Sequence, residues 1–488
     1  MTLAQRAVRG TAFVLASSYT NMAIGMASGI IMARLLDPGH FGIFAGAMFF
    51  FTLLDLRGKL GLDYAFIHCQ PTTDSLVGTH WALQVGASLI TLIAVAMTAT
   101  VVTRLDYAAA TAPIMIALAG AMIVEAAGAT ARAALEKELV FGRSTIVVTG
   151  ALLLSYAAAI GLAAQGYAFW ALVGQVTVNA VVSSAGFWWA YRRLGRRPSL
   201  LFSFDRALAG WMLRFGATVA LGAVATVILL QFDNFLVLTF VGSAAAGYYV
   251  QAYKVAQWPT GLVTHIVARA SLPTYAKLQD DPRRLSKAFE LSLWLILTAA
   301  VPIALAIFVS APDFLTLLYG EKWLPSAVLL RYLIVYSVLR PLLDDTGALF
   351  AAIGQPRRIT LVLISQAVTL VAVATPLTLT LGAAGTAVGV GVAFVVGIGL
   401  TYWFVSKTLI INLVRVFAPP TLATISTLAL YWILTHLVDL NVLPLLLRVL
   451  GKGGFAAGVF FAIILLLEQR ALFERIGYIW RLLRSRPA

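Results

Sequence analysis

Residues 247–259 read GYYVQAYKVAQWP and place one lysine, Lys254, in a segment with no other charge. The segment lies within residues 244–273, which are long enough to span a bilayer core of about 20 apolar residues. A cation at the centre of such a helix costs roughly 2.5–3.5 kcal/mol if it faces lipid. The stretch therefore predicts a transmembrane helix with one side turned to water or to other protein groups.

The composition of the whole chain predicts the same environment. The 488 residues are 61% hydrophobic and 11% charged, whereas a soluble domain carries about 25% charged residues. The mean hydropathy is +0.91. Apolar runs of about 20 residues recur from end to end. We expect an all-α polytopic membrane protein.

The apolar runs predict about fourteen transmembrane helices. The N-terminal run is too long for a cleaved signal peptide and is taken as the first helix. The expected spans are 10–33, 41–66, 79–103, 110–131, 144–164, 166–190, 208–232, 244–273, 288–311, 325–352, 359–380, 382–406, 418–438 and 446–467.

The distribution of basic residues predicts the orientation. A net charge of +15 would suit a nucleic-acid partner in a soluble protein. Here, with a cytoplasmic N-terminus, 23 of the 35 Lys and Arg residues fall in inside segments, 5 in outside segments and 7 within or near the spans. Basic residues favour the cytoplasmic side. Both termini are therefore expected in the cytoplasm, and no nucleic acid is expected as a partner.

The loops divide the spans into two halves. We expect an N-terminal lobe of six helices at 1–190, a cytoplasmic linker at 191–207 and a C-terminal lobe of six helices at 208–407. Residues 408–488 supply two more helices and a basic cytoplasmic tail.

A sequence echo indicates that the halves are repeats. Arg9 and Gly42 begin short motifs that recur at Arg214 and Gly247, each 205 positions later. Transporters built from parallel repeats have this kind of internal symmetry. The echo is short, and glycine is frequent in this chain, with 39 residues.

Catalytic and cofactor signatures are absent from the sequence. Cys69 is the only cysteine, so neither an intrachain disulfide nor a paired-thiol metal site can form. We find no Ser/His/Asp spacing, phosphate-binding glycine loop or HExxH motif. The expectation is a transporter rather than an enzyme, without cofactor or metal, driven by something other than its own ATPase.

The predicted helix 244–273 carries a polar stripe. Gln251, Lys254, Trp258 and His265 fall within an arc of about 80° at helical spacing. Lys254, with Gln251 and Trp258 beside it, is a candidate to bind an anionic group of a substrate, and His265 is a candidate proton carrier. Pro259 predicts a kink.

A purely structural role for Lys254 remains open. A carboxylate from another span could pair with the lysine inside the membrane, and three aspartates are candidates. They are Asp344, Asp233 and Asp55.

The predicted second span carries four charges in LLDLRGKLGLDYAF, residues 53–66. Asp55, Lys59 and Asp63 follow one another at i, i+4 and i+8, so they can neutralise one another along one helix face. Arg57 points elsewhere and is the better candidate for substrate, with Lys59 as a second. A structural network is an equal alternative.

The predicted tenth span carries Arg331, Arg340, Asp344 and Asp345. Arg340 and Asp344 are spaced to form an i, i+4 pair, and both arginines are candidates for substrate binding. Adjacent aspartates also suit a metal-dependent glycosyltransferase. Such an enzyme needs a sizeable loop or domain around its site, whereas the outside loops here do not exceed about 15 residues.

Five motifs carry a family resemblance. In order and spacing the chain resembles the Wzx-type polysaccharide exporters of the multidrug/oligosaccharidyl-lipid/polysaccharide superfamily, from the first span through the twelfth. The motifs are ARLLDPGHFGIF (33–44), GYYVQAYKVAQWP (247–259), ARASLPTYAKLQDDPRRL (268–285), YGEKWLPSAVLLRYL (319–333) and GALFAAIGQPRR (347–358). The chain departs from the family pattern at Gly39 and His40, where acidic residues are usual, and at Arg57 and Lys59, where neutral or acidic residues are usual.

The resemblance implies a flippase of the bacterial cytoplasmic (inner) membrane. Such a protein moves an undecaprenyl-pyrophosphate-linked oligosaccharide by alternating access, for lipopolysaccharide or exopolysaccharide synthesis, and an ion gradient is thought to drive it. The implied partners are the lipid-linked oligosaccharide, membrane lipids, and the polymerase and glycosyltransferases of the pathway. Pyrophosphate would meet Arg57, Lys254, Arg331 and Arg340. The candidates for ion coupling are Asp344, Asp55, Asp233 and His265.

Two other functions remain as alternatives. An ion-coupled multidrug exporter should have an unpaired acidic residue in its cavity. A membrane polymerase or ligase acting on lipid-linked glycan should have a large outside loop with catalytic Arg or His.

Overall fold

The computed structural model describes residues 3–104, 110–195 and 203–484, and every regular element within these ranges is a helix. The chain divides into two compact units, Met1–Val250 and Gln251–Ala488. The predicted all-α fold class is confirmed.

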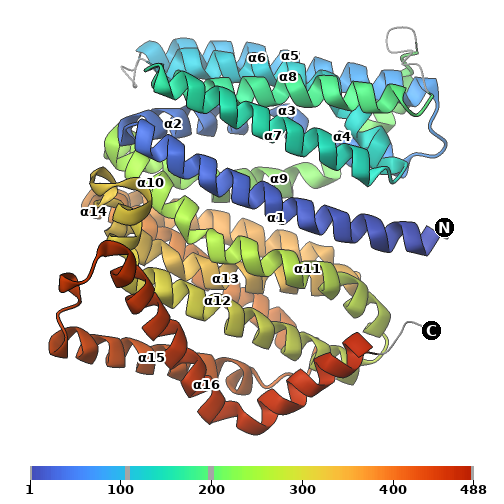
Figure 1. The fold of residues 1–488 in the computed structure, drawn as a ribbon. Helices are drawn as coiled ribbons and strands as arrows, with labels where there is room; N and C mark the ends of the chain where they lie inside the picture. The colour runs from blue at the N-terminus through green and yellow to red at the C-terminus, as the bar shows by residue number, and fades with distance from the viewer. Residues whose placement is uncertain (1–2, 105–109, 196–202, 485–488) are drawn as a thin grey trace. The chain divides into compact units, whose positions relative to one another are not determined.

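Unit 1 contains the first nine helices and the start of the tenth (Figure 1). Long helices α5 to α8 lie side by side, and α6 is the most buried of them. The helices are α1 (Leu3–Leu35), α2 (Pro38–Leu54), α3 (Leu56–Lys59), α4 (Leu62–His68), α5 (Asp74–Arg104), α6 (Thr111–Lys137), α7 (Phe141–Ala164), α8 (Trp170–Arg192), α9 (Arg206–Phe240) and α10 (Ser243–Ala256).

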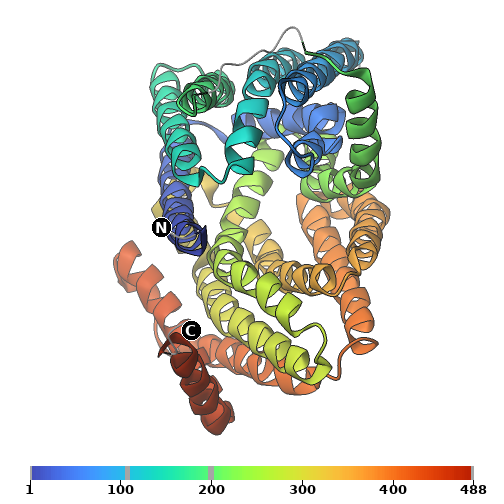
Figure 2. The same cartoon turned by 90° about the vertical axis from the view of Figure 1, so that its right-hand side faces the viewer.

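Unit 2 is built around α12, the most buried of its long helices (Figure 2). Its elements after α10 are α11 (Trp258–Leu278), α12 (Pro282–Tyr319), η1 (Glu321–Trp323), α13 (Ser326–Ala352), α14 (Pro356–Ser406), α15 (Leu413–Leu437), η2 (Leu440–Val442) and α16 (Leu445–Arg484). α14 comprises two helices that meet at Gly382, where φ is 62°. This junction separates the predicted spans 359–380 and 382–406.

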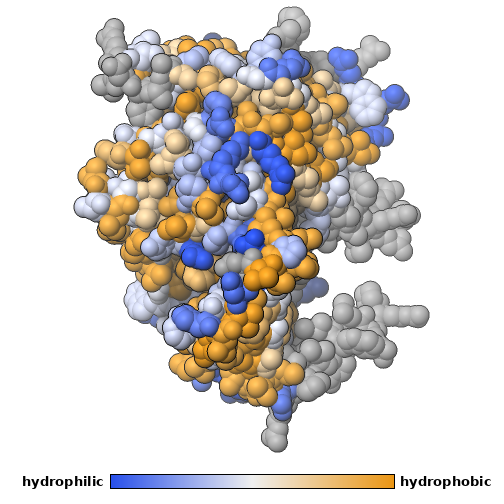
Figure 3. All heavy atoms as spheres, turned by 60° about the vertical axis from the view of Figure 1, so that its left-hand side comes forward, coloured by the Kyte–Doolittle hydropathy of each residue, from blue (hydrophilic) through white to orange (hydrophobic). Residues whose placement is uncertain are grey.

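The exterior matches a membrane environment. Ten helices among the described residues are long and apolar enough to cross a bilayer. Large hydrophobic side chains such as Ile90, Ile93 and Met97 on α5 are exposed, and hydrophobic residues cover much of the face in Figure 3. The chain is therefore a multi-span membrane protein, while the count of fourteen spans and the cytoplasmic termini stay predictions.

The predicted second span, 41–66, is wrong as a single helix. α2 ends at Leu54, and Asp55 is extended, with ψ at 102°. α3 follows for one turn, and α4 begins after Gly61, whose φ of 54° lies in the left-handed region that glycine adopts without strain. The break thus leaves several main-chain groups without helical hydrogen-bond partners, and these groups need other partners.

The predicted kink in span 244–273 is confirmed. α10 ends at Ala256 and α11 begins at Trp258, directly before Pro259. The proline lacks the N–H that would continue the helical hydrogen bonding, so the axis bends here.

A reciprocal contact joins the first turns of α2 and α10. A Cβ on Gly42 would lie 1.9 Å from the carbonyl oxygen of Ser243, and a Cβ on Gly247 would lie 1.8 Å from that of Pro38. Gly247 follows Gly42 by 205 positions, and Ser243 follows Pro38 by the same interval. The two helix ends therefore meet through equivalent residues, which supports the internal repeat.

Candidate functional site

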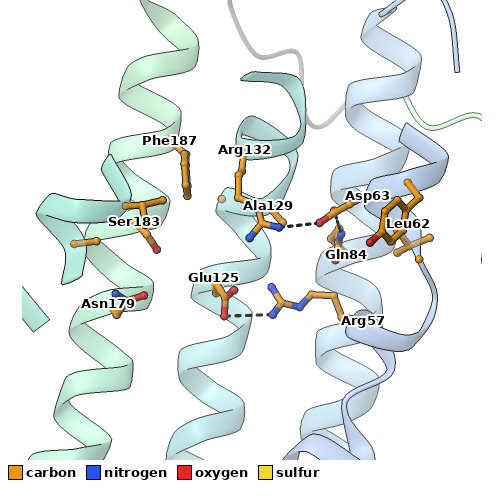
Figure 4. A pocket seen from close by; sticks show the side chains of 15 residues that line it. Arg57, Leu62, Asp63, Gln84, Glu125, Ala129, Arg132, Asn179, Ser183 and Phe187 are labelled. Carbon is orange, nitrogen blue, oxygen red and sulfur yellow. Dashed lines mark hydrogen bonds and ion pairs between the residues drawn. The ribbon is translucent and has the colours of Figure 1, made fainter. Parts of the chain in front are cut away.

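A charged cavity of about 370 Å³ lies within unit 1 (Figure 4). Six helices, α3 to α8, contribute its walls, and glycine and alanine on α6 and α7 leave room for it. Its polar lining consists of Arg57, Asp63, Tyr64, Gln84, Glu125, Arg132, Asn179 and Ser183.

The break after α2 positions Arg57. The carboxylate of Asp55 accepts a hydrogen bond from the main-chain N–H of Arg57 at 3.0 Å, so it caps the short helix α3. The Lys59 ammonium donates to the carbonyl oxygens of Thr52 (2.9 Å), Leu53 (2.7 Å) and Asp55 (2.8 Å). These are carbonyls that the end of α2 leaves without helical partners. Asp55 and Lys59 therefore hold the break, and Arg57 projects from it.

Two arginines in the cavity face carboxylates from other segments. The Arg57 guanidinium lies 3.2 Å from the Glu125 carboxylate of α6, and Figure 4 shows the two side chains pointing toward each other. Arg132, also on α6, lies 3.4 Å from Asp63 and 3.3 Å from Glu136. The prediction that Lys59 neutralises Asp63 is wrong, because the helix break separates them.

Asp63 is the centre of a larger polar network. The Gln84 amide donates to its carboxylate at 2.7 Å, and His80 Nε2 lies 3.3 Å from the same oxygen. His80 is fully buried, and its Nδ1 is 2.8 Å from the Thr130 hydroxyl. This network fixes the position of Asp63 and, through Asp63, of Arg132.

Most of this cavity was missed by reasoning from the sequence. Arg132 lies just outside the predicted fourth span, 110–131, whereas α6 continues to Lys137. One signal was present, since Glu125 and Arg132 are seven positions apart and so lie on one face of a helix. Nothing in the sequence joined His80 or Gln84 to Asp63.

Of the seven residues predicted to bind substrate, Arg57 lines this cavity. The predicted pair of Arg340 and Asp344 is confirmed, with Nε 2.9 Å from the carboxylate. Arg331 is exposed, and its guanidinium lies 5.8 Å from the centre of the Phe308 ring. Arg331, Arg340 and Asp344 belong to unit 2.

The remaining candidates on α10 and α11 have different surroundings. Lys254 is exposed, whereas its neighbour Gln251 is buried. The Trp258 ring packs edge-on against Phe314 at 6.0 Å. The side chain of His265 lies outside the described residues.

Asp233 on α9 is buried in unit 1. Its carboxylate accepts hydrogen bonds from the Tyr249 hydroxyl at 3.0 Å and from the main-chain N–H of Asn234 at 2.8 Å. Neither group carries a positive charge.

Unit 2 contains a second cavity of about 380 Å³, bounded by α12, α13 and α15. Aliphatic side chains form most of its walls. The other lining residues include Phe308, Phe417, Thr421 and Thr424. It offers no charged group to an anion. Among the described residues, no group of three or more His, Cys, Asp or Glu is placed to hold a metal ion.

The charged cavity suits an oxyanion that can replace a carboxylate. Guanidinium groups bind phosphate and carboxylate oxygens in the same forked geometry. Arg57 is largely buried, with 16% of its side chain exposed, whereas Glu125 is 45% exposed. Glu125 can therefore turn toward solvent while Arg57 stays in place.

The fold and this cavity define a polytopic helical membrane protein with a charged cavity among its helices. Residues 31–328 match the polysaccharide biosynthesis protein family, and the chain belongs to that family. The resemblance inferred from the five motifs is thereby confirmed.

Three relatives illustrate the match. The lipopolysaccharide biosynthesis protein WzxC of Escherichia coli (strain K12) is 25% identical over 355 residues, 72% of this chain and 71% of WzxC. An uncharacterized membrane protein in the cps region of Klebsiella pneumoniae is 24% identical over 498 residues, 98% of this chain and 99% of that protein. The succinoglycan biosynthesis transport protein ExoT of Rhizobium meliloti (strain 1021) is 24% identical over 60% of this chain and 58% of ExoT.

Solved structures share the fold. The lipid II flippase MurJ in an inward closed conformation matches with a TM-score of 0.74 at 13% identity, covering 93% of this chain and 98% of MurJ. An inward-facing multidrug resistance transporter of the MATE family matches with a TM-score of 0.64 at 18% identity, covering 80% of this chain and 94% of that one.

Proposed function

We propose that this protein is a flippase that moves an undecaprenyl-pyrophosphate-linked oligosaccharide across the bacterial cytoplasmic membrane, for cell-surface polysaccharide synthesis. The carrying observation is the cavity in which Arg57 and Arg132 each face a carboxylate. Family membership and relatives named for lipopolysaccharide and succinoglycan synthesis support the substrate class. The proposed role is transport without catalysis.

The cavity has the chemistry that a pyrophosphate needs. Moving a phosphate group out of water is costly unless cations and hydrogen-bond donors replace its hydration. Arg57 and Arg132 would supply forked donors, and Gln84 and Asn179 would supply amides for phosphate or sugar oxygens. The polyprenyl chain would remain in lipid.

The carboxylates give the empty protein a neutral cavity. If the two arginines had no counter-ions, closing the cavity to water would cost the desolvation free energy of two unpaired positive charges. Glu125 and Asp63 supply the missing negative charge when no substrate is present. Entering pyrophosphate would displace them, and they would return when it leaves, so that the empty carrier can reset.

Alternating access would follow from movement of the two predicted lobes, 1–190 and 208–407, relative to each other. The same fold has been solved in inward-facing and outward-facing states in MATE transporters, with TM-scores of 0.64 and 0.52 to this chain. Glycosyltransferases that build the substrate and a polymerase that consumes it would be its pathway partners.

The multidrug alternative has less support in this cavity. A site for cationic drugs needs a carboxylate that is free to meet the drug. Both carboxylates that face the two arginines here, Glu125 and Asp63, are already ion-paired.

The test replaces the arginines singly. We expect Arg57→Ala and Arg132→Ala to insert normally but to reduce surface polysaccharide at least tenfold in a strain that lacks the native gene. In proteoliposomes they should weaken binding of a soluble short-chain polyprenyl-pyrophosphate sugar. Arg284→Ala is the matched control, because that arginine is exposed and pairs with Asp281 outside the cavity. Normal export by both cavity variants at normal protein levels would refute the assignment.

A further inference from the structure

The aliphatic cavity of unit 2 is a groove that is open on one side. α12 packs against both α13 and α15, and the groove lies along α12 between these two helices (Figure 1). Val301 and Leu305 on α12 are buried at its floor, whereas Val335 on α13 and Ile425 on α15 are exposed at its rims. In a membrane, hydrocarbon would fill such a groove.

The groove has the length of one lipid chain within one leaflet. On α12 its lining extends from Leu297 to Phe308, which corresponds to about 16 Å at the rise of an α-helix. The hydrocarbon core of a bilayer is about 30 Å thick, so one leaflet contributes about 15 Å. An acyl chain in the groove would thus stay within its own leaflet, whereas the far longer undecaprenyl chain would fit only in part.

A cation with neutral partners lies at one end of the groove. Arg331 on α13 precedes the lining residue Ile334 by one turn of the helix. Its Nε donates to the carbonyl oxygen of Phe308 at 3.4 Å, and its guanidinium lies 5.8 Å from the centre of the Phe308 ring. Arg331 is exposed, and no carboxylate among the described residues pairs with it. An anionic ligand at this end would supply the missing negative charge.

The acid nearest to Phe308 along α12 is engaged elsewhere. That acid is Asp313, and its carboxylate lies 3.3 Å from Arg448 and 2.6 Å from Lys452, both on α16. The Asp313 side chain is 11% exposed. Because two cations already hold this carboxylate, it is not available to neutralise Arg331.

The polar residues at this end lie at the depth of lipid headgroups. Arg331 is close to the start of its predicted span, 325–352, and Asp313 lies just beyond the end of the predicted span 288–311. The Tyr431 hydroxyl of α15 donates to the Val309 carbonyl oxygen at 3.2 Å, next to the Phe308 carbonyl that Arg331 contacts. Tyrosine and arginine are typical of the zone where hydrocarbon meets headgroups.

We propose that the groove binds one anionic phospholipid, with its phosphate at Arg331 and one acyl chain between α13 and α15. A guanidinium binds phosphate oxygens through forked hydrogen bonds. The acyl chain would cover the exposed side chains of Val335 and Ile425. A phospholipid joins a charged group directly to a chain of the length of one leaflet, and the groove with Arg331 at its end matches both parts.

The bound lipid would stabilise unit 2 independently of the anion cavity. It would fill the space between α13 and α15, and a ligand that binds only the folded arrangement raises its stability as the ligand concentration rises. No residue that lines the groove lines the charged cavity of unit 1. Failure of this proposal would therefore leave the proposed flippase function untouched.

The experiment measures lipid binding to the full-length protein in detergent. Phosphatidylglycerol or phosphatidylcholine is titrated in, bound lipid is counted by native mass spectrometry, and the thermal midpoint is recorded. We expect one phosphatidylglycerol to bind with a saturable rise in the midpoint. Arg331→Gln should weaken this binding about tenfold, because it removes charge-assisted hydrogen bonds. Ala304→Leu, which adds bulk at the floor of the groove, should weaken binding of both lipids.

A matched control tests which end of the groove holds the phosphate. Arg415→Gln removes an exposed arginine of α15 that precedes the lining residue Phe417, at the other end of the groove, and it should bind phosphatidylglycerol as the wild type does. If Arg331→Gln fails to fold, the preference of the wild type for phosphatidylglycerol and the loss in Ala304→Leu carry the test.

Three results would overturn the proposal. The first is equal binding of phosphatidylglycerol and phosphatidylcholine by the wild type. The second is unchanged phosphatidylglycerol binding by folded Arg331→Gln. The third is displacement of bound phosphatidylglycerol by an equimolar polyprenyl phosphate, which would assign the groove to the tail of the transported lipid instead.

Discussion

At the scale of single residues, neighbouring cations on one short segment have different tasks. Lys59 is 9% exposed and donates to three main-chain carbonyls, whereas Arg57 faces a carboxylate in a cavity. A lysine that satisfies buried carbonyls stabilises the fold, and its loss leaves those carbonyls without partners. An arginine in a cavity can exchange partners.

The first prediction concerns Lys59→Met, which keeps the length of the side chain and removes the ammonium. We expect the free energy of unfolding to fall by about 3 kcal/mol, since each unsatisfied buried acceptor costs roughly 1–3 kcal/mol. Thermal unfolding in detergent measures the loss. Folded Lys59→Met protein should still bind the pyrophosphate analogue, whereas Arg57→Ala should lose binding with little loss of stability. A reversed pattern would assign Lys59 to the substrate.

The second prediction concerns Glu125→Gln, which removes the counter-ion of Arg57 and keeps its shape. Binding of the analogue should tighten by up to about fivefold, because a partly exposed ion pair contributes roughly 1 kcal/mol. Steady-state transport should slow, because the empty cavity then carries an uncompensated charge during the reset. Equilibrium binding and multiple-turnover transport are measured on the same protein. Tighter binding together with faster turnover would contradict the counter-ion role.

The site could be predicted in part from these residues. Arg57 stood out because a charge in an apolar run demands an explanation. Its partner Glu125 and the second arginine, Arg132, come from another helix, and their meeting depends on how the helices pack. Spacing along one segment suggested Lys59 for Asp63, and the tertiary structure instead supplies Arg132, His80 and Gln84.

At the scale of elements, the break between α2 and α4 depends on a close approach by α9. A Cβ on Gly216 would lie 1.6 Å from the carbonyl oxygen of Leu60, so the helix backbone packs directly on the broken segment. Only glycine permits such an approach without a shift of one backbone. The segment that carries Arg57 is thus fixed by two contacts: the Lys59 ammonium binds the end of α2, and the backbone of α9 packs against Leu60.

The third prediction follows from this contact. Gly216→Ala should lower the free energy of unfolding by about 1–3 kcal/mol through overpacking, and it should reduce export by displacing the segment that carries Arg57. Gly222→Ala on the same helix is the control, because a Cβ on Gly222 would have no neighbouring atom within 4 Å. That control should be neutral or slightly stabilising. Thermal unfolding and surface polysaccharide are measured for both, and equal behaviour of the two variants would contradict the role of the contact.

The bend between α10 and α11 can be predicted from the sequence, whereas the break after α2 cannot. Pro259 predicts the bend between α10 and α11, because a proline inside a helix removes a hydrogen bond. The break at Asp55 has no such marker. The charges and glycines of LLDLRGKLGLDYAF are compatible with a continuous span, and the contacts that hold the break come from the Lys59 side chain and from Gly216, which is more than 150 positions away along the chain.

At the scale of the whole molecule, the repeat is the feature that connects sequence to mechanism. The motif echo at 205 positions was weak as a pattern, and the structure places its glycines in a reciprocal contact between α2 and α10. Each glycine lets the carbonyl of the other helix's first turn approach closely. A contact made twice by equivalent residues can open and close as a unit, as a transporter with repeats requires.

The last prediction tests whether this contact must open during transport. A Cβ on Gly39 would lie 3.7 Å from the Ser243 hydroxyl oxygen, so side chains at these two positions are in van der Waals contact. In a Cys69→Ser background, Gly39→Cys with Ser243→Cys should cross-link under oxidation, block export, and recover it on reduction. Each single cysteine variant treated with the same oxidant is the control. Because alternating access needs the ends of equivalent helices to separate in one state, full transport by the cross-linked protein would mean that the movement occurs elsewhere.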